Sequence, residues 1–416
     1  MRSPNRWLNC SIHFVKNIIV ATLRVWILSI CAFCILSKNT RADAPVLSFL
    51  DVSFGSAKRT ASDTFVQDSG PDYNLYGRSI ALTQPQATKL QIQLHLDIQP
   101  ITAAGTIEIT AIGGGLTFNT IQSVISGGGT GNQSIFTLVS VGNLPSGTRI
   151  INLSLAYYYR VIPPEGSGTW VFLGTSNNKF FLTLSYPTVD ATLTRTALNI
   201  ACQKPGATIE SQAIADLWST ISSLSLKNYS GSNLSYYPSG SHFHECANSI
   251  ETLLLTKKGQ CSSFAELMVD CLQSHGIASG EVKTIGPAGQ DLMVIKKWSI
   301  NNIGSQTPPW IYTETALYLL PVYFDMAAGV IGDWSLEPGV AGQNSPSPSQ
   351  KVFANHVVVS YGQKLYDPSY GKIYNDLPDF VSQALQGTGI RVQPDTFGRT
   401  VIHMKSPAVP TDVKFL

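Results

Sequence analysis

The hydrophobic pattern of this chain changes its period near Pro187, which divides the sequence into two kinds of fold. Before that point apolar and polar residues alternate, as in residues 89–99, and a period of two is typical of a half-buried strand. More strands are expected at 46–54, 106–112, 135–141, 149–162, 169–173 and 180–186, with Gly- and Pro-rich turns between them. The pattern therefore predicts an all-β sandwich of immunoglobulin-like size over residues 45–188.

After Pro187 the period becomes helical. Amphipathic helices are expected at 209–224, 243–255 and 261–275, followed by strands at 278–285, 292–300, 351–361 and 364–370. Helices followed by a sheet predict an α+β domain over residues 189–416. Residues 301–350 are expected to form a long loop. They include Trp310, Tyr312, Tyr318, Tyr323, Phe324 and Trp334, which are expected either to contact substrate or to pack the loop down or cover the β-sandwich.

The first 44 residues have the layout of a secretory signal peptide. Residues 25–37 are uncharged but too few to span a bilayer, basic residues precede them, and Ala42-Asp43-Ala44 follows. We expect cleavage after Ala44, a mature chain that starts at Pro45, and a secreted, periplasmic or cell-surface location. An uncleaved membrane anchor is the alternative. No stable membrane span is expected after cleavage, because no later segment is apolar enough.

The charge distribution argues against a nucleic-acid partner. The whole chain carries a formal net charge of +2, but residues 1–44 hold six basic side chains and one acid. The expected mature chain is therefore slightly acidic, whereas proteins that bind nucleic acids carry clustered positive charge.

Three separated residues predict nucleophilic catalysis. Cys261 follows Gly259-Gln260 and opens an expected helix, whose N-terminus favours a thiolate and can point N–H groups at an oxyanion. His356 and Asp367 fall on two expected antiparallel strands joined by a Gly362-Gln363 hairpin. Cys261, His356 and Asp367 would then act as nucleophile, base and orienting carboxylate.

The sequence around these residues resembles the transglutaminase-like superfamily. GQCSSFAELMVDCLQSHGI is similar to its active-site segment, and NHVVVSYGQKLYDPSYG is similar to its His strand and Asp-Pro-Ser/Thr strand, over roughly residues 195–385. The resemblance implies a papain-like α+β fold and a Cys261–His356–Asp367 triad. Val358 stands where many members have an aromatic residue. The gap between Cys261 and His356 is longer than usual, which implies an insertion at about 301–350 that covers substrate.

Such a triad would attack an amide carbonyl and form a thioester, which water or an amine then resolves. We expect a cysteine peptidase or amidase acting on a protein or peptide substrate, without a cofactor or metal. A protein-crosslinking transglutaminase is the alternative, and a non-catalytic exported adhesion or scaffold protein is a third possibility. The expected oxyanion donors are the Cys261 N–H and one of Trp218, Tyr236 and Tyr237.

Four cysteines remain after cleavage, and an exported chain meets an oxidising compartment. Cys246 is therefore a candidate disulfide partner of Cys202, while Cys271 is expected in the core. His242, His244, Glu245 and Cys246 resemble a metal cluster in composition, but their spacing around a helix start makes them diverge. His275 is expected to be a charged partner of a helix end.

Overall fold

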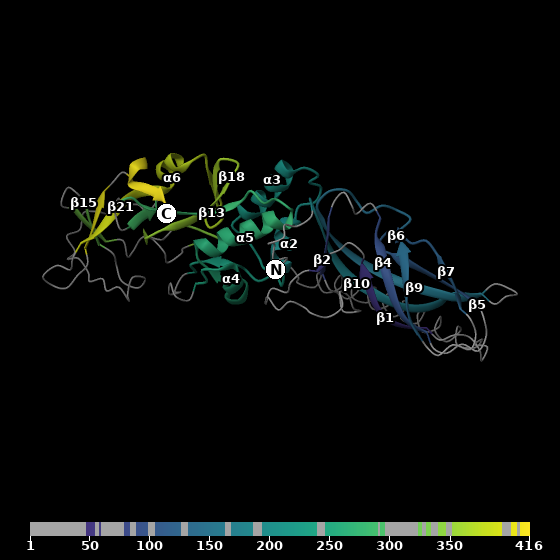
Figure 1. The fold of residues 1–416 in the computed structure, drawn as a ribbon. Helices are drawn as coiled ribbons and strands as arrows, with labels where there is room; N and C mark the ends of the chain where they lie inside the picture. The colour runs from purple at the N-terminus through teal and green to yellow at the C-terminus, as the bar shows by residue number, and fades with distance from the viewer. Residues whose placement is uncertain are drawn as a thin grey trace, which may run out of the picture.

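The structure is a computed structural model of the 416-residue chain. It describes residues 47–54, 58–59, 79–83, 89–98, 105–125, 132–162, 168–185, 194–238, 246–289, 292–295, 323–326, 330–333, 340–346, 352–392, 401–405 and 408–416. The chain is β-rich, with several separate sheets. In Figure 1 the early strands lie at one end, helices α2–α5 near the middle and the late strands at the other end.

Two sheets form the first half of the protein. One has the order β1-β4-β8, and the other has the order β2-β3-β10-β9-β5-β6 with β7 also paired to β5. The strands are β1 (Leu47–Phe54), β2 (Lys58–Arg59), β3 (Ser79–Thr83), β4 (Gln91–Ile98), β5 (Gly105–Gly113), β6 (Leu116–Thr117), β7 (Ile121–Ile125), β8 (Asn132–Val139), β9 (Arg149–Ile162) and β10 (Val171–Thr183).

These two sheets share one hydrophobic core. Leu94 and Leu96 of β4 belong to the same buried cluster as Ile107 of β5 and Leu155 of β9. The alternating pattern of residues 89–99 correctly predicted which side chains of β4 are buried, because successive side chains of a strand point to opposite faces.

One strand prediction was wrong in its boundaries. The separate strands expected at 169–173 and 180–186 are one strand, β10, which pairs with β9 along its length. In its polar middle Ser176 and Asn178 are buried and hydrogen-bonded: the Tyr157 and Ser176 hydroxyls lie 2.8 Å apart, and Asn178 Nδ2 donates to Ser176 Oγ at 3.0 Å. A polar stretch therefore continues the strand rather than forming a turn.

Five α-helices are described in the second half: α2 (Arg195–Ala201), α3 (Glu210–Ile221), α4 (Ile250–Thr256), α5 (Cys261–Ser274) and α6 (Leu377–Ala384). The helix expected at 243–255 starts only at Ile250. Ser249 is its N-cap, and the side chain of Ser249 accepts a hydrogen bond from Thr252 N–H. Ala247 instead forms a parallel bridge with Gly259, because the segment before α4 runs beside the segment that leads into α5.

A five-stranded sheet packs against α5, through β18 above all. Its order is β20-β19-β18-β13-β23, and its strands are β20 (Lys372–Tyr374), β19 (Lys364–Asp367), β18 (His356–Tyr361), β13 (Glu281–Pro287) and β23 (Val413–Phe415). A short parallel pair, β11 (Ser235–Tyr236) and β12 (Lys258–Gly259), lies next to the start of α5. Helix, pair and sheet contribute to one buried core.

A further sheet has the order β16-β15-β22-β21-β14-β17. Its strands are β14 (Leu292–Ile295), β15 (Tyr323–Met326), β16 (Val330–Asp333), β17 (Val352–Phe353), β21 (Leu385–Val392) and β22 (Val401–Lys405). Two of these strands, β15 and β16, lie in the expected insertion at 301–350, most of which is outside the described residues. The signal peptide expected over residues 1–44 is outside them as well. No helix in the described part of the chain is long and apolar enough to cross a membrane.

Candidate active site

Cys261 is the first residue of α5, as the sequence predicts. The backbone two residues before Cys261 is tightly packed. A Cβ added to Gly259 would lie 2.6 Å from Ser263 Oγ and 2.8 Å from side-chain carbons of Leu253 and Phe264. Gly259 therefore allows β12 to lie directly against the first turn of the helix. Cys261 itself is buried.

The N-terminus of α5 has no side-chain cap. Gln260 occupies the N-cap position, but its side-chain amide donates to the carbonyl of Cys246 at 2.9 Å instead. The N–H groups of a first helical turn have no partner within the helix and carry partial positive charge. The backbone around Cys261 can thus stabilise negative charge on the sulfur or on an oxygen bound beside it.

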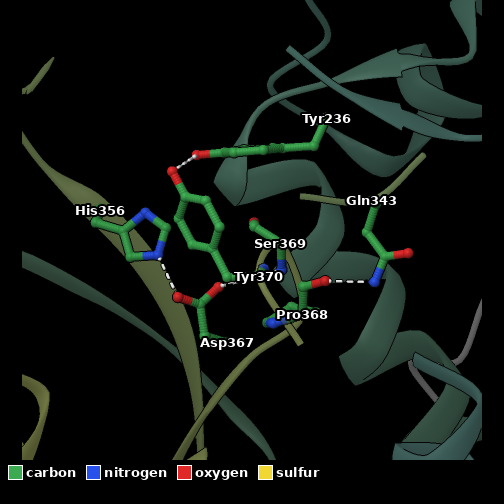
Figure 2. A network of polar contacts seen from close by, with 7 residues as sticks. All are labelled: Tyr236, Gln343, His356, Asp367, Pro368, Ser369 and Tyr370. Carbon is green, nitrogen blue, oxygen red and sulfur yellow. Dashed lines mark hydrogen bonds and ion pairs between the residues drawn. The ribbon is translucent and has the colours of Figure 1, made fainter. Parts of the chain in front are cut away.

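His356 and Asp367 face each other on adjacent antiparallel strands. The sequence predicts this placement, and β18 pairs with β19 through Val359–Tyr366 and Tyr361–Lys364. His356 Nε2 lies 2.8 Å from Asp367 Oδ2, and both side chains are fully buried (Figure 2). The imidazole therefore has a fixed orientation.

Asp367 is fixed from its other side by the backbone that follows it. Its Oδ1 accepts hydrogen bonds from the N–H groups of Ser369 at 3.1 Å and Tyr370 at 3.2 Å. Pro368, which lies between Asp367 and Ser369, has no N–H to donate, and its ring fixes the backbone of the turn. The carboxylate has hydrogen bonds on both oxygens, which offset the cost of burying it.

His356 is held in its charged form. Burial lowers the pKa of His356, but the Asp367 carboxylate and the nearby Cys261 sulfur outweigh this effect and raise the pKa to about 10. Within the described residues, no hydrogen bond of ordinary geometry reaches its Nδ1. This nitrogen faces away from Asp367 and is therefore available to interact with the Cys261 sulfur or with a ligand.

Aromatic rings surround the imidazole. Phe380 of α6 stacks on it at a centroid distance of 6.1 Å, Phe353 of β17 lies at 5.5 Å and Tyr370 at 5.6 Å. These rings exclude water from the His356–Asp367 pair, and low local polarity strengthens the interaction between the two charges.

Sequence reasoning missed Tyr370 and Gln343, which complete the site. The hydroxyl of Tyr236 donates to that of Tyr370 with an O–O distance of 3.4 Å. Gln343 donates from Nε2 to the carbonyls of Pro368 at 2.8 Å and Ile221 at 2.7 Å (Figure 2 draws the first). Tyr370 follows the Asp-Pro-Ser motif directly, a signal that could have been used, whereas Gln343 lies in a Gly- and Ser-rich stretch without any periodic pattern.

The three expected oxyanion side chains have different surroundings. Trp218 packs edge-on against Tyr366, with centroids 5.1 Å apart. Tyr236 is fully buried at the site, and Tyr237 packs edge-on against it at 4.8 Å. Only Tyr236 among the three reaches Tyr370 in the described contacts.

The candidate disulfide between Cys202 and Cys246 is not formed in the structure. Cys202 is a free, buried thiol whose Sγ donates to the carbonyl of Leu182 at 3.3 Å, and Cys246 is free as well. The expectation for His275 was wrong. His275 is not a charged partner of a helix end. It is buried between β10 and α2, its Nδ1 accepts from Leu184 N–H at 3.2 Å, and burial lowers its pKa to about 4.

The expected core position of Cys271 agrees with the structure, where Cys271 is fully buried and its Sγ donates to the carbonyl of Ala197 at 3.4 Å. His242, His244 and Glu245 lie outside the described residues. Among the residues that are described, no three His, Cys, Asp or Glu side chains gather in a way that could hold a metal ion.

Comparison of the chain with protein-family models and with curated proteins gave no match. The chemistry must therefore be judged from the arrangement itself: a cysteine at an uncapped helix N-terminus, a charged imidazole near its sulfur, and a carboxylate fixed behind the imidazole. Such a set of groups can activate a thiol for attack on a carbonyl.

Proposed function

We propose that this protein is a cysteine acyl-transfer enzyme that acts on amide bonds of a protein or peptide substrate. The observation that carries the proposal is the position of His356, whose Nε2 bonds Asp367 at 2.8 Å while the Cys261 sulfur lies close enough to raise its pKa. A histidine that only fills space in a core does not require a buried carboxylate on one side and a thiol on the other, whereas a catalytic histidine does.

In the proposed mechanism Cys261 and His356 rest as a thiolate and an imidazolium. The thiolate adds to the amide carbonyl, the imidazolium gives its proton to the departing amine, and a thioester remains. His356, now neutral, takes a proton from water or from an acceptor amine as that molecule attacks the thioester. Asp367 keeps the imidazole oriented and stabilises its charge.

The fold supports the same proposal. We infer that the two sheets of the first half form a β-sandwich module and that the α5–β18–β19 unit belongs to a transglutaminase-like, papain-like domain. The support is the order of the three motifs in the sequence and the packing of α5 against β18. We further propose that residues 1–44 direct export and are removed, so that the substrate is extracellular or in the cell envelope.

Hydrolysis and transfer use the same residues, and we favour a peptidase or amidase over a crosslinking transglutaminase. Incubation with fluorescently labelled casein, with and without a dansylated primary amine, separates them. Release of small peptides or ammonia alone supports a hydrolase, and incorporation of the dansyl group supports a transferase. If neither occurs and Cys261 alkylates no faster than a free cysteine, the protein is a non-catalytic adhesion or scaffold protein.

A further inference from the structure

Two buried phenols stand beside the nucleophile and have no role in the mechanism so far. Tyr236 is fully buried on β11, directly next to β12, which leads into Cys261. Its ring lies edge-on to Phe264 of the first turn of α5 at 6.1 Å. Tyr370 comes from the other side, three residues after Asp367, and its ring is 5.6 Å from that of His356. The two hydroxyls therefore meet between α5 and the β18–β19 hairpin.

The spacing of these hydroxyls suits a shared acceptor. Their oxygens are 3.4 Å apart, longer than the usual O–H···O hydrogen bond of about 2.7–2.8 Å. Two donor atoms at this separation can both lie within hydrogen-bond distance of one further oxygen. Among the described residues the Tyr370 hydroxyl makes no other hydrogen bond, so its own proton is available to such an oxygen. The Tyr236 hydroxyl has one proton, which it gives to Tyr370 across the long 3.4 Å contact, and it donates to such an oxygen by turning this proton away from Tyr370.

The phenols also stay protonated in this place. Burial raises the pKa of both Tyr236 and Tyr370, and the neighbouring Cys261 and, for Tyr370, Asp367 disfavour a phenolate further. They therefore keep their protons and can donate hydrogen bonds to an anion without transferring a proton to it.

We propose that the hydroxyl pair of Tyr236 and Tyr370 donates hydrogen bonds to the oxyanion that forms when Cys261 attacks a substrate carbonyl. This role rests on the proposed function. The sulfur–carbon bond forms as the C=O electron pair moves onto oxygen, where the two phenols and a backbone N–H at the start of α5 stabilise it. The oxyanion then collapses, the C–N bond breaks, and His356 protonates the amine.

The role can be tested with two thiol reagents, of which only one forms an oxyanion when it reacts. Iodoacetamide reacts with a thiolate at a saturated carbon and forms no oxyanion, whereas p-nitrophenyl acetate reacts at a carbonyl and does. We expect Tyr370→Phe and Tyr236→Phe in the full chain each to slow acylation of Cys261 by about 100-fold, the loss typical of a removed oxyanion donor. Alkylation by iodoacetamide should keep its rate and its pH profile.

Tyr374→Phe is the matched control, because Tyr374 is buried nearby on β20 but packs against Phe380 at 5.1 Å. It should leave both rates unchanged. If Tyr370→Phe slows neither reaction, or slows both equally, the phenols are packing or thiolate-binding groups and the inference is wrong. If wild-type Cys261 reacts with both reagents like a free cysteine, the proposed function fails, and the phenol role fails with it.

Discussion

The backbone N–H of Tyr236 donates to the carbonyl of Gln343 at 2.8 Å, and the N–H of Gln343 donates to the carbonyl of Ser369 at 3.0 Å. Gln343 thus joins the strand that carries one phenol to the turn that carries Asp367 and the other phenol. Gly342 makes the close approach possible, since a Cβ there would lie 2.5 Å from the Tyr236 ring. The end of the expected insertion is therefore part of the site.

Replacement of Gln343 by Leu should destabilise the protein. The buried carbonyls of Pro368 and Ile221 would lose their donor, and the N–H of Leu226 would lose the Oε1 that it reaches at 3.3 Å. Each buried polar group left unpaired costs about 1–3 kcal/mol, so the free energy of unfolding should fall by about 3 kcal/mol or more. Urea unfolding measures this change.

Gln383→Leu is the control for that substitution. Gln383 is an exposed residue of α6 that donates to Asp379, and surface substitutions of this kind usually change stability by less than about 0.5 kcal/mol. Equal effects at Gln343 and Gln383 would show that Gln343 does not hold the two segments together.

The contacts of Gln343 show where a replacement of the insertion must end if it is to test substrate binding without disturbing the site. We expect a Gly/Ser linker in place of residues 310–339 to leave fast alkylation of Cys261 by iodoacetamide while turnover of labelled casein falls. A linker in place of 310–344 also removes Gln343 and Asn344, whose Nδ2 donates to the carbonyls of Leu226 and Leu234. That longer replacement should slow alkylation and lower the melting temperature. If the shorter replacement does both as well, the insertion is structural rather than a binding element.

Much of this site could be predicted from the sequence because its parts have local signals. Cys261 follows a glycine and opens an amphipathic helix, and His356 and Asp367 lie on either side of a two-residue hairpin, so their meeting follows from strand geometry. Tyr236 and Gln343 meet through contacts between segments that lie far apart in the chain. Periodicity and spacing contain no information about such contacts.

The errors in the predicted fold also arise from contacts between segments that are distant in the chain. The polar middle of β10 reads as a turn, but Tyr157 on the neighbouring strand satisfies Ser176. The residues before Ile250 have a helical pattern, yet Ala247 bonds to the segment before Cys261 instead, with its N–H on the Lys258 carbonyl at 2.8 Å. Tertiary hydrogen bonds override local preference at both places.

The Asp367→Asn variant should change how stability depends on pH. Asp367 and the Cys261 sulfur together outweigh burial and raise the pKa of His356 from 6.5 to about 10. The charged histidine therefore stabilises the fold fully below about pH 6.5, and this stabilisation is lost as pH rises through about 10. The loss of one partner of a buried pair costs about 3–5 kcal/mol, and we expect a deficit of that order at pH 6 that shrinks by pH 10. Urea unfolding at pH 6, 8 and 10 measures it.

Asp379→Asn serves as the matched change for Asp367→Asn. Asp379 is a partly exposed carboxylate on α6 that bonds Asn375 and Gln383, with no histidine among these described partners. Its effect on unfolding should be constant across the same pH range. A deficit at Asp367 that is equally constant would contradict the proposed charge on His356.

His275 should make the protein sensitive to acid. Its folded pKa of about 4 lies below the usual 6.5, so the unfolded chain takes up the proton first and stability falls as pH drops from 6.5 through 4. Each proton taken up on unfolding lowers the free energy of unfolding by about 1.4 kcal/mol for each pH unit of this range. We expect His275→Gln to flatten this slope in urea unfolding, and His95→Gln on β4 to leave it in place. An unchanged slope in His275→Gln would place the acid sensitivity elsewhere.

Substitution of the two cysteines of α5, one at a time, should affect activity and stability separately. Cys261→Ala removes the proposed nucleophile at the first turn, where little packing is lost, so turnover of labelled casein should disappear while the melting temperature stays near that of the wild type. Cys271 lies in the core against α2, and burial raises the pKa of its thiol, which favours the unreactive form. Cys271→Ala should therefore keep its activity but melt earlier, because the lost sulfur leaves a small cavity. Turnover and thermal melting of both variants, measured side by side, decide the assignment. If Cys271→Ala is inactive and Cys261→Ala is not, the nucleophile has been misplaced and the proposed triad is wrong.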